Sequence, residues 1–257
     1  MTGGDRGAPP GGPGPRSIVR LSSVDSTQAV AWALVEGGAA DGTVVVADTQ
    51  RQGRGRQGRA WHDEPGRSLL MSLVWRPRLA PAALPALSLL AAVAVAEAVA
   101  RVSPVTPRLK WPNDVLVSGR KLAGILLESR VGADAIVVIG IGINLAQPEF
   151  PPDLQGLATS LLLETGRTPG RDAMLAAVLE ALDRWRARLE AEGFAPIRER
   201  WRALADTLGA RVSVDGVSAL ALDLDADGAL LVDDGRGVRR VIAGEVTREE
   251  VGGAARD

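Results

Sequence analysis

Residues 47–61 read ADTQRQGRGRQGRAW and form the most distinctive segment of the chain. The segment interleaves three glycines with four arginines, which are Arg51, Arg54, Arg56 and Arg59. Glycine allows the backbone to approach a ligand closely, and each guanidinium offers a planar fork of donors that fits phosphate or carboxylate oxygens. We therefore predict a loop that closes over a polyanionic ligand. A solvated arginine-rich loop, the usual fate of a charge run, is the alternative.

The three glycines of this segment, Gly53, Gly55 and Gly58, also match the dinucleotide-binding pattern G-x-G-x-x-G. They follow an apolar run at residues 43–47 that is typical of a strand. The dinucleotide-binding fold requires a helix to begin directly after the glycines. Here residues 61–66 read WHDEPG, which is a turn sequence. A Rossmann domain is therefore not expected.

Length and composition narrow the class of protein. A chain of 257 residues suits one large or two unequal domains with a substantial core. The formal net charge of −1 provides no overall attraction to nucleic acid or membranes. The absence of cysteine excludes disulfides and thiolate chemistry, and together with the lack of an apolar N-terminal segment it favours a cytoplasmic location. The apolar run at residues 84–102 predicts a buried helix rather than a membrane span.

Lysine and asparagine are rare in this arginine-rich chain. Among 30 basic residues only Lys110 and Lys121 are lysines, and the only asparagines are Asn113 and Asn144. Three of these four residues fall between positions 110 and 121. Because lysine and arginine are not interchangeable at a binding site, we favour a functional role over solvated lysines at the edge of a sheet.

Apolar periodicity and turn residues divide the chain into three regions. Residues 1–15 are rich in glycine and proline and are expected to be a disordered tail. Residues 16–206 alternate strands with helices and predict an α/β (α+β) domain. Strands are expected at 18–21, 43–49, 68–75, 115–128 (as a hairpin) and 135–145. A helix is expected from a cap at 25–27 to about residue 36, and others at 84–102, 171–192 and 194–204. Pro112 should interrupt a strand, because proline cannot donate to a sheet.

Residues 207–257 differ from the preceding region in their pattern of apolar and turn residues. Short β-type runs at 211–214, 219–224, 229–232 and 238–246 are separated by turns rich in aspartate and glycine. This pattern predicts a small β-barrel appended to the α/β domain.

Four motifs stand in a characteristic order: GRGRQGRAW at 53–61, KWPND at 110–114, KLAGILLE at 121–128 and GIGINL at 140–145. In this order and spacing they resemble the motifs of the biotin protein ligases, and the similarity extends from about Ser22 to the C-terminus. The resemblance implies a catalytic domain with a mixed β-sheet and helices on one side, followed by a small SH3-like barrel. It implies an enzyme that activates biotin with Mg-ATP to biotinyl-5′-AMP. The biotinyl group then passes to one lysine of a biotin carboxyl carrier domain.

The resemblance also implies which residues form the site. The expected catalytic residues are Lys110, Lys121, Arg56 and Asp114. The expected biotin-binding residues are Ser26, Thr27, Gln28, Gln50, Gly53, Arg54, Gly55, Arg56, Lys121 and Gly124. The expected ATP-binding residues are Arg54, Arg56, Arg59, Trp61, Lys110, Asn113 and Asn144. Cations suit this chemistry, because a carboxylate must approach the α-phosphate of ATP. Magnesium is expected on the phosphates without direct protein ligands.

Several of these residues have structural alternatives. Asp114 is either a base for the attacking lysine or a turn acceptor beside Asn113. Trp61 either stacks near the nucleotide or anchors the loop by packing. Ser26 and Thr27 are also candidate helix caps, and Gln28 stands where the family often has asparagine.

Two other functions compete with biotin ligation. A lipoate or octanoate ligase would use a related fold, although the arginine loop disfavours it. A nucleic-acid-binding module would use the basic loop, but the near-neutral charge and the lack of an aromatic stacking platform disfavour that reading. Only the flexible tail precedes the first expected strand, so we expect a ligase without operator binding, with neither nucleic acid nor membrane as a partner. Residues 243–245 resemble the closing turn of the family's barrel.

Overall fold

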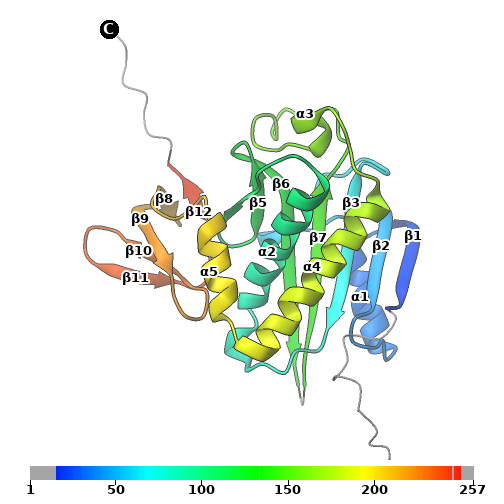
Figure 1. The fold of residues 1–257 in the computed structure, drawn as a ribbon, viewed down its shortest axis with the longest axis horizontal. Helices are drawn as coiled ribbons and strands as arrows, with labels where there is room; N and C mark the ends of the chain where they lie inside the picture. The colour runs from blue at the N-terminus through cyan, green and yellow to red at the C-terminus, as the bar shows by residue number, and fades with distance from the viewer. Residues whose placement is uncertain (1–15, 133, 245, 250–257) are drawn as a thin grey trace, which may run out of the picture.

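A computed structural model describes residues 16–132, 134–244 and 246–249. Its larger part is a seven-stranded sheet in the order β1-β2-β3-β7-β6-β5-β4, and a separate five-stranded sheet follows at the C-terminal end (Figure 1). The predicted tail at residues 1–15 lies outside the described residues, as does Glu245 of the predicted closing turn.

The large sheet is mixed, as predicted. Its strands are β1 (Ile18–Val24), β2 (Val44–Gln50), β3 (Ser68–Trp75), β4 (Arg108–Lys110), β5 (Asp114–Val117), β6 (Arg120–Val131) and β7 (Ala135–Asn144). β1 pairs with β2 in parallel, and every other neighbouring pair is antiparallel. Pro112 lies in the turn between β4 and β5, so the prediction that it interrupts a strand is confirmed.

The helices cover both faces of this sheet. Helices α2 (Ala86–Val102), α4 (Arg171–Glu192) and α5 (Ala195–Leu204) pack with the sheet into the main core. Helix α1 (Thr27–Glu36) instead packs through Ala31 and Trp32 on Val45, Val74 and Val138, in a second cluster. The expectation of helices on one side therefore holds for α2, α4 and α5 but not for α1. A crossover between parallel strands is right-handed, and this fixes the face on which α1 lies.

Helix α2 is the most buried helix of the fold. The segment Pro81–Val102, which includes the short 3₁₀ turn η2 (Pro81–Ala83), is long and apolar enough to span a membrane by composition, yet 72% of its most apolar window is buried inside the protein. It lies beside α4, and both helices pack on the same face of the sheet (Figure 1). The prediction of a buried core helix is confirmed.

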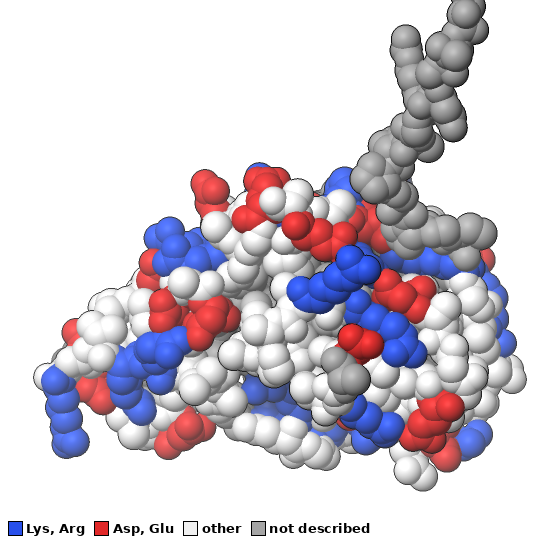
Figure 2. Space-filling model, turned by 90° about the horizontal axis from the view of Figure 1, so that it is seen from below, with Lys and Arg blue, Asp and Glu red and all other residues white. Residues whose placement is uncertain are grey.

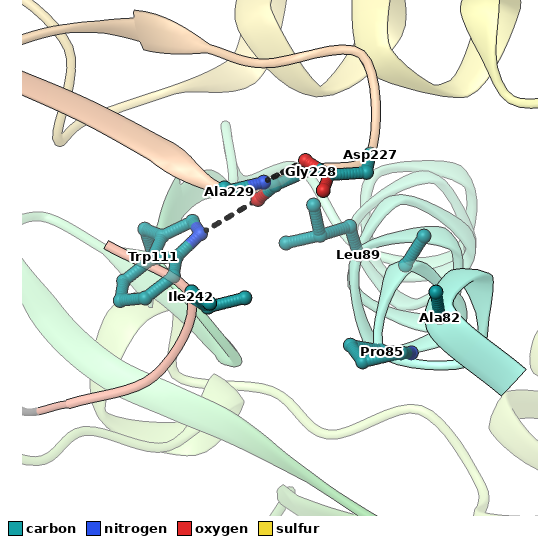
Figure 3. Close-up of a pocket in the computed structure, with 9 residues that line it drawn as sticks. Ala82, Pro85, Leu89, Trp111, Asp227, Gly228, Ala229 and Ile242 are labelled. Carbon is teal, nitrogen blue, oxygen red and sulfur yellow. Dashed lines mark hydrogen bonds between the residues drawn. The ribbon is translucent and has the colours of Figure 1, made fainter. Parts of the chain in front are cut away.

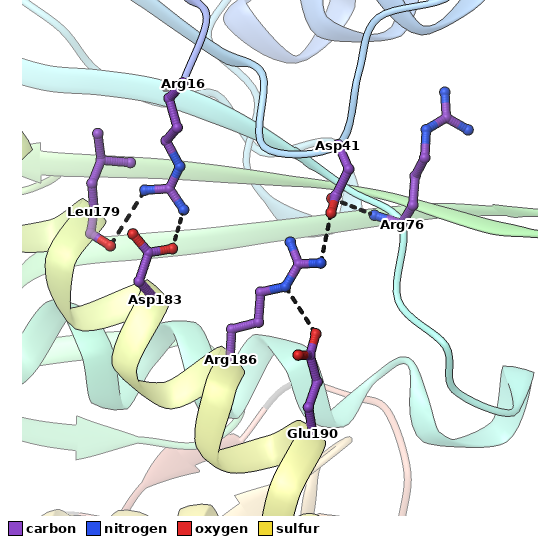
Figure 4. A network of polar contacts seen from close by, with 7 residues as sticks. All are labelled: Arg16, Asp41, Arg76, Leu179, Asp183, Arg186 and Glu190. Carbon is purple, nitrogen blue, oxygen red and sulfur yellow. Dashed lines mark hydrogen bonds and ion pairs between the residues drawn. The ribbon is translucent and has the colours of Figure 1, made fainter. Parts of the chain in front are cut away.

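Helix α4 is tied to the N-terminal strand region by a polar network (Figure 4). Arg16 forms an ion pair with Asp183, and its Nη1 atom donates to the backbone oxygen of Leu179. Arg186 Nη2 lies 2.6 Å from Asp41 Oδ2, and Arg186 Nε lies 3.0 Å from Glu190 Oε1. These contacts join the loop before β2 to the helix layer on the main-core face.

The C-terminal sheet is antiparallel and has the order β11-β10-β9-β8-β12. Its strands are β8 (Arg211–Val214), β9 (Val217–Leu224), β10 (Leu230–Asp233), β11 (Val238–Val241) and β12 (Val246–Arg248). The single run expected at 238–246 is in fact two strands at opposite edges of the sheet. The strands break there because Gly244 adopts a φ of +140°, and closure into an SH3-like barrel stays a prediction. The short helix α3 (Leu161–Thr165) was not predicted.

Candidate functional site

Three glycines form a floor on the α1 face of the large sheet. Gly124 of β6 lies directly opposite Gly142 of β7, and Gly140 lies opposite Leu126. Successive side chains along a strand point to opposite faces. Gly140 and Gly142 therefore share the face of Val138, which packs against α1. This glycine floor, defined by Gly124, Gly140 and Gly142, leaves the backbone of two adjacent strands open to contact.

One row of paired residues crosses the sheet at the level of the glycine floor. Lys110 pairs with Asp114, Asp114 pairs with Gly124, and Gly124 pairs with Gly142. Residues directly opposite in adjacent strands lie on the same face. The sheet therefore brings the motifs KWPND, KLAGILLE and GIGINL together, with Lys110 and Asp114 at the β4 end of the floor.

A buried polar cluster lies at the N-terminus of α1. Gln50 Oε1 accepts hydrogen bonds from Thr27 N at 2.8 Å and Thr27 Oγ1 at 3.0 Å. Ser72 Oγ lies 2.9 Å from Thr27 Oγ1 and 3.0 Å from Gln28 Oε1. Gln28 Nε2 donates to Val138 O at 3.0 Å. Four side chains from α1, β2 and β3 thus form one network beside the floor.

The helix is capped differently from the expectation. Ser26 occupies the N-cap position but makes no side-chain capping hydrogen bond. Gln50 accepts from the backbone N–H of Thr27 instead, so β2 supplies the cap of α1. Ser72 was missed by sequence reasoning. Its signal was a serine in the middle of the apolar run LLMSLVW of β3, where a buried hydroxyl requires a polar partner.

The arginine–glycine loop is a short hairpin with a 3₁₀ turn, η1 (Arg56–Gly58), at its tip. Trp61 N donates to Gly53 O at 2.9 Å, and Gly55 N donates to Arg59 O at 2.7 Å. A side chain at Gly53 would place its Cβ 3.0 Å from Trp61 O and 3.3 Å from Gln50 Nε2. The predicted absence of a Rossmann helix after these glycines is confirmed.

The indole ring of Trp61 lies directly on the glycine floor. A Cβ atom at Gly142 would be 2.7 Å from Trp61 Cε2 and Cζ2, and a Cβ atom at Gly124 would be 3.1 Å from Trp61 Cζ3. Lys121 Nζ lies 5.8 Å from the centroid of the same ring. The loop therefore reaches across the sheet and covers the floor with its only aromatic side chain.

Four of the predicted site residues meet at the β5 end of the floor. Lys121 Nζ forms an ion pair with Asp114 Oδ1 at 2.7 Å. Arg56 Nη1 donates to Asn113 Oδ1 at 3.3 Å, and Asn113 Nδ2 donates to the backbone oxygen of Ile125 at 2.8 Å. Burial lowers the pKa of Arg56, Asp114 opposes this, and Arg59 adds to it. Two cations are thus held side by side with one carboxylate between them.

Other residues of the predicted set are engaged elsewhere. Arg54 Nη2 lies 3.7 Å from Glu128 Oε1, in the C-terminal half of β6. Arg51, which belongs to the same loop, is exposed and is bound to Asp25 at 2.8 Å and to Ser23 Oγ at 3.0 Å. Asn144 is 4% exposed and donates through Nδ2 to Thr159 O at 3.0 Å, so it holds the segment after β7 in place. Its expected contact with ATP stays a prediction.

Asp63 is a further residue that sequence reasoning missed, because the segment WHDEPG was read only as a turn. Asp63 Oδ2 accepts from Gln50 N at 3.2 Å, which ties the base of the arginine–glycine loop to β2. Burial raises the pKa of Asp63, although hydrogen bonds from Thr49, Gln50 and Ser68 oppose the rise. Within the described residues, no group of three or more histidine, cysteine or acidic side chains is placed to hold a metal ion.

Comparisons with known proteins identify the family to which the chain is similar. Residues 21–144 match the biotin/lipoate A/B protein ligase family. The chain is 37% identical over 237 residues to the biotin–(acetyl-CoA-carboxylase) ligase of Paracoccus denitrificans, covering 88% of this chain and 98% of that protein. It is 35% identical over 237 residues to the bifunctional ligase/repressor BirA of Bacillus spizizenii, covering 89% of this chain and 73% of that protein.

Solved structures agree with the sequence comparison. The fold is similar to the biotin protein ligase from Aquifex aeolicus in complex with biotin and ATP, with a TM-score of 0.80 and 30% identity. The aligned region covers 91% of this chain and 98% of that chain.

The raised pKa of Asp63 makes folding stability depend on pH. The folded protein holds this proton at pH values where the unfolded chain, with an ordinary pKa of 3.8, has lost it. Stability therefore falls as pH rises from that value through the folded-state pKa. Compared with Asp63→Asn, the wild type should lose free energy of unfolding over this interval, measured by urea denaturation from about pH 4 to 7. A difference between the two proteins that stays constant with pH would contradict the assignment.

Proposed function

Since the chain belongs to the biotin protein ligases of the biotin/lipoate A/B protein ligase family, we propose that it activates biotin with ATP to biotinyl-5′-AMP and transfers the biotin to a lysine of a biotin carboxyl carrier domain. The observation that carries this proposal is the convergence of Lys110, Asp114 and the glycine floor in one row, beside Lys121 and Arg56. This arrangement lies beside bare backbone at the glycine floor, which the ring of a ligand can approach closely.

The first step joins two anions, because the carboxylate of biotin attacks the α-phosphorus of ATP and pyrophosphate leaves. Fixed positive charge at the point of attack lowers this barrier. We assign Lys121 to the biotin carboxylate and α-phosphate, and Lys110 to the phosphates. Arg56 is half-buried and its burial disfavours the charged form, so an anion beside it offsets this cost. Arg59 and Asn113 would complete the nucleotide site.

The biotin ring is neutral and bicyclic, with a ureido group at one end and an apolar tail at the other. Such a ligand suits a pocket with a few fixed polar groups and apolar walls. Thr27, Gln28 and Gln50 form a buried polar network that matches the ureido end, and Ser26 is buried beside them. A ligand that touches Gly124 and Gly142 must displace the Trp61 ring, because that ring now fills the contact distance. Trp61 then becomes a wall or a cap over the bound ligand.

In the second step the amine of the carrier lysine attacks the carbonyl carbon of biotinyl-5′-AMP. A C–N bond forms, the bond between the carbonyl carbon and the phosphate oxygen breaks, and AMP leaves with its negative charge. The amine must lose one proton, and Asp114 is the carboxylate in the row beside the floor that would accept it. Asp114 is paired with Lys121, so binding of the anionic intermediate to Lys121 would free Asp114 for this role.

The finer assignments follow from the same chemistry. Magnesium would accompany ATP on the phosphate oxygens. The carrier would be the biotin carboxyl carrier protein or domain of an acyl-CoA carboxylase, as the name of the Paracoccus denitrificans relative indicates for that protein. We propose a cytoplasmic enzyme that binds neither operator DNA nor membranes. On the face seen in Figure 2, basic and acidic side chains are interspersed. The formal net charge of −1 disfavours a nucleic-acid-binding module.

The direct test is incubation of the purified protein with biotin, Mg-ATP and a carrier domain from the same source. Biotin should appear on one carrier lysine, detected by mass spectrometry, and AMP and pyrophosphate should form in equal amounts. Lipoate added in excess should not compete. Transfer of lipoate or octanoate in place of biotin would instead support the related ligase activity, and no transfer to an active carrier would overturn the proposal.

The glycine floor predicts a mutation that blocks biotin. Gly142→Ala adds a methyl group 2.7 Å from the Trp61 ring, on the surface that the ligand needs. We expect the Kd for biotin to rise at least about tenfold, which corresponds to about 1.4 kcal/mol of binding free energy. Isothermal titration calorimetry measures it. The matched control is Gly170→Ala, where no atom lies within 4 Å of the new methyl group. An unchanged Kd in Gly142→Ala would argue against the floor as the biotin site.

A substitution in the arginine–glycine loop should cause loss of the reaction intermediate rather than loss of biotin affinity. Arg56→Gly removes the guanidinium that donates to Asn113 and interacts electrostatically with Asp114, and it should let biotinyl-5′-AMP escape. Because the released anhydride acylates amines without selection, biotin should appear on lysines of bystander proteins, seen on streptavidin blots. Arg51→Gly is the control, since Arg51 is bound to Asp25 outside the floor. A variant that labels only its carrier at the wild-type rate would refute the role.

A further inference from the structure

The strand that carries Lys110 is unusually dependent on a distant part of the chain. β4 has three residues, Arg108–Lys110, and lies at the edge of the large sheet. A strand this short, paired on one side only, has little stability of its own. The side chain of Lys110 can be held at the floor only if something else fixes the backbone of β4.

The segment that follows α5 supplies this support. Leu109 forms a parallel β-bridge with Ala205, and Asp206 N donates to Leu109 O at 2.8 Å. Trp111 N, directly after Lys110, donates to Thr207 Oγ1 at 2.9 Å. Thr207 is 3% exposed, so this bond lies in a dry environment. The outer edge of β4 is therefore covered by residues 205–207, immediately before the C-terminal sheet.

The side chain of Trp111 makes a second connection. Its ring is 2% exposed, and its Nε1 atom donates to the backbone oxygen of Gly228 at 3.1 Å (Figure 3). Gly228 lies in the turn between β9 and β10 with a φ of +88°, and a Cβ atom there would be 2.7 Å from Leu89 of α2. The turn is thus pressed against the core helix and cannot shift easily. Figure 3 shows Trp111, Leu89 and Ile242 around the hollow at this junction.

We propose that Thr207 and Trp111 are positioning residues for adenylation. They hold the backbone from Lys110 to Asn113 so that Lys110 and Asn113 face the nucleotide, and through them the C-terminal region contributes to catalysis without touching substrate. The inference rests on the proposed function, because it assigns Lys110 and Asn113 to ATP. A displacement of about 1 Å at a reacting centre is enough to cost about a hundredfold in rate.

The location of these contacts predicts which substrate should be affected when they are lost. The polar network for biotin lies on α1, β2 and β3, whereas β4 is the opposite edge of the sheet from β1. Loss of the support should therefore impair the use of ATP and leave the binding of biotin alone unchanged. A merely structural role would lower both together, along with the stability of the fold.

The test compares substitutions that remove one hydrogen bond each. Thr207→Val keeps the shape but removes the acceptor for Trp111 N, and Thr207→Ser restores a hydroxyl. Trp111→Phe keeps an aromatic ring but removes the donor to Gly228. Trp201→Phe is the matched control, because Trp201 is also buried, in neighbouring α5, and its indole N–H has no hydrogen-bond partner among the described residues.

The readouts are the kcat and KM for ATP in biotinyl-5′-AMP formation by the full chain, the Kd for biotin alone, and the thermal unfolding temperature. Thr207→Val and Trp111→Phe should lower kcat/KM for ATP at least tenfold with the biotin Kd unchanged within twofold. Thr207→Ser should recover most of the loss, and Trp201→Phe should behave as wild type.

Three outcomes would overturn the positioning role: unchanged kcat/KM in both variants, equal loss in Trp201→Phe, or a parallel loss of biotin affinity. If Thr207→Val does not fold, the comparison of Trp111→Phe with Trp201→Phe decides. Failure of the wild type itself to form biotinyl-5′-AMP would instead refute the proposed function, which distinguishes the two hypotheses.

Discussion

The register between β6 and β7 is the constraint on which the rest of the site depends. In the observed register Gly124 meets Gly142, and two strands together expose bare backbone. A slip of one residue would place Gly124 opposite Ile141 or Ile143, whose side chains now fill the main core. It would also turn every side chain of the strand to the other face. The apolar residues that alternate with the glycines therefore fix the site, because the core accepts only one alignment.

The same register gathers positive charge before any ligand is present. Lys121 and Arg56 lie at the β5 end of the floor, with Asp114 and Asn113 as their partners. Burial opposes the charge on Arg56, so the arrangement is less favourable without an anion than with one. A protein that holds two cations near an aromatic ring and bare backbone is preorganised for a ligand with an anionic and an apolar part. Arg56 and Trp61 belong to the same loop, so one segment supplies both a cation and an aromatic ring to the site.

The parts of this site that could be predicted are those written in contiguous motifs. The four motifs name Lys110, Asp114, Lys121 and Gly124, and the strands that carry them follow from apolar patterning. The face of α1 could not be predicted, because the crossover rule applies only once β1 is known to pair in parallel with β2, and this pairing joins strands that lie apart in the sequence. Ser72 and Asp63 were missed for a similar reason. Their partners Thr27 and Gln50 lie elsewhere in the sequence, and a buried polar residue has no local signature.

Neighbouring residues of the motif KWPND have two different roles, and only the folded structure distinguishes them. Lys110 lies in the row that leads to the glycine floor, whereas Trp111, the next residue, makes its hydrogen bonds with the C-terminal region. Lys110 ends β4 and Trp111 begins the turn before β5, so one short segment serves the site with one residue and the C-terminal region with the next. The C-terminal sheet shares the main core with α2, and Gly228 is pressed on Leu89 of the same helix. Helix α2 therefore packs both on the large sheet and on the turn that holds Trp111. Through this helix the large sheet and the C-terminal sheet together support the positions of the cations in the site.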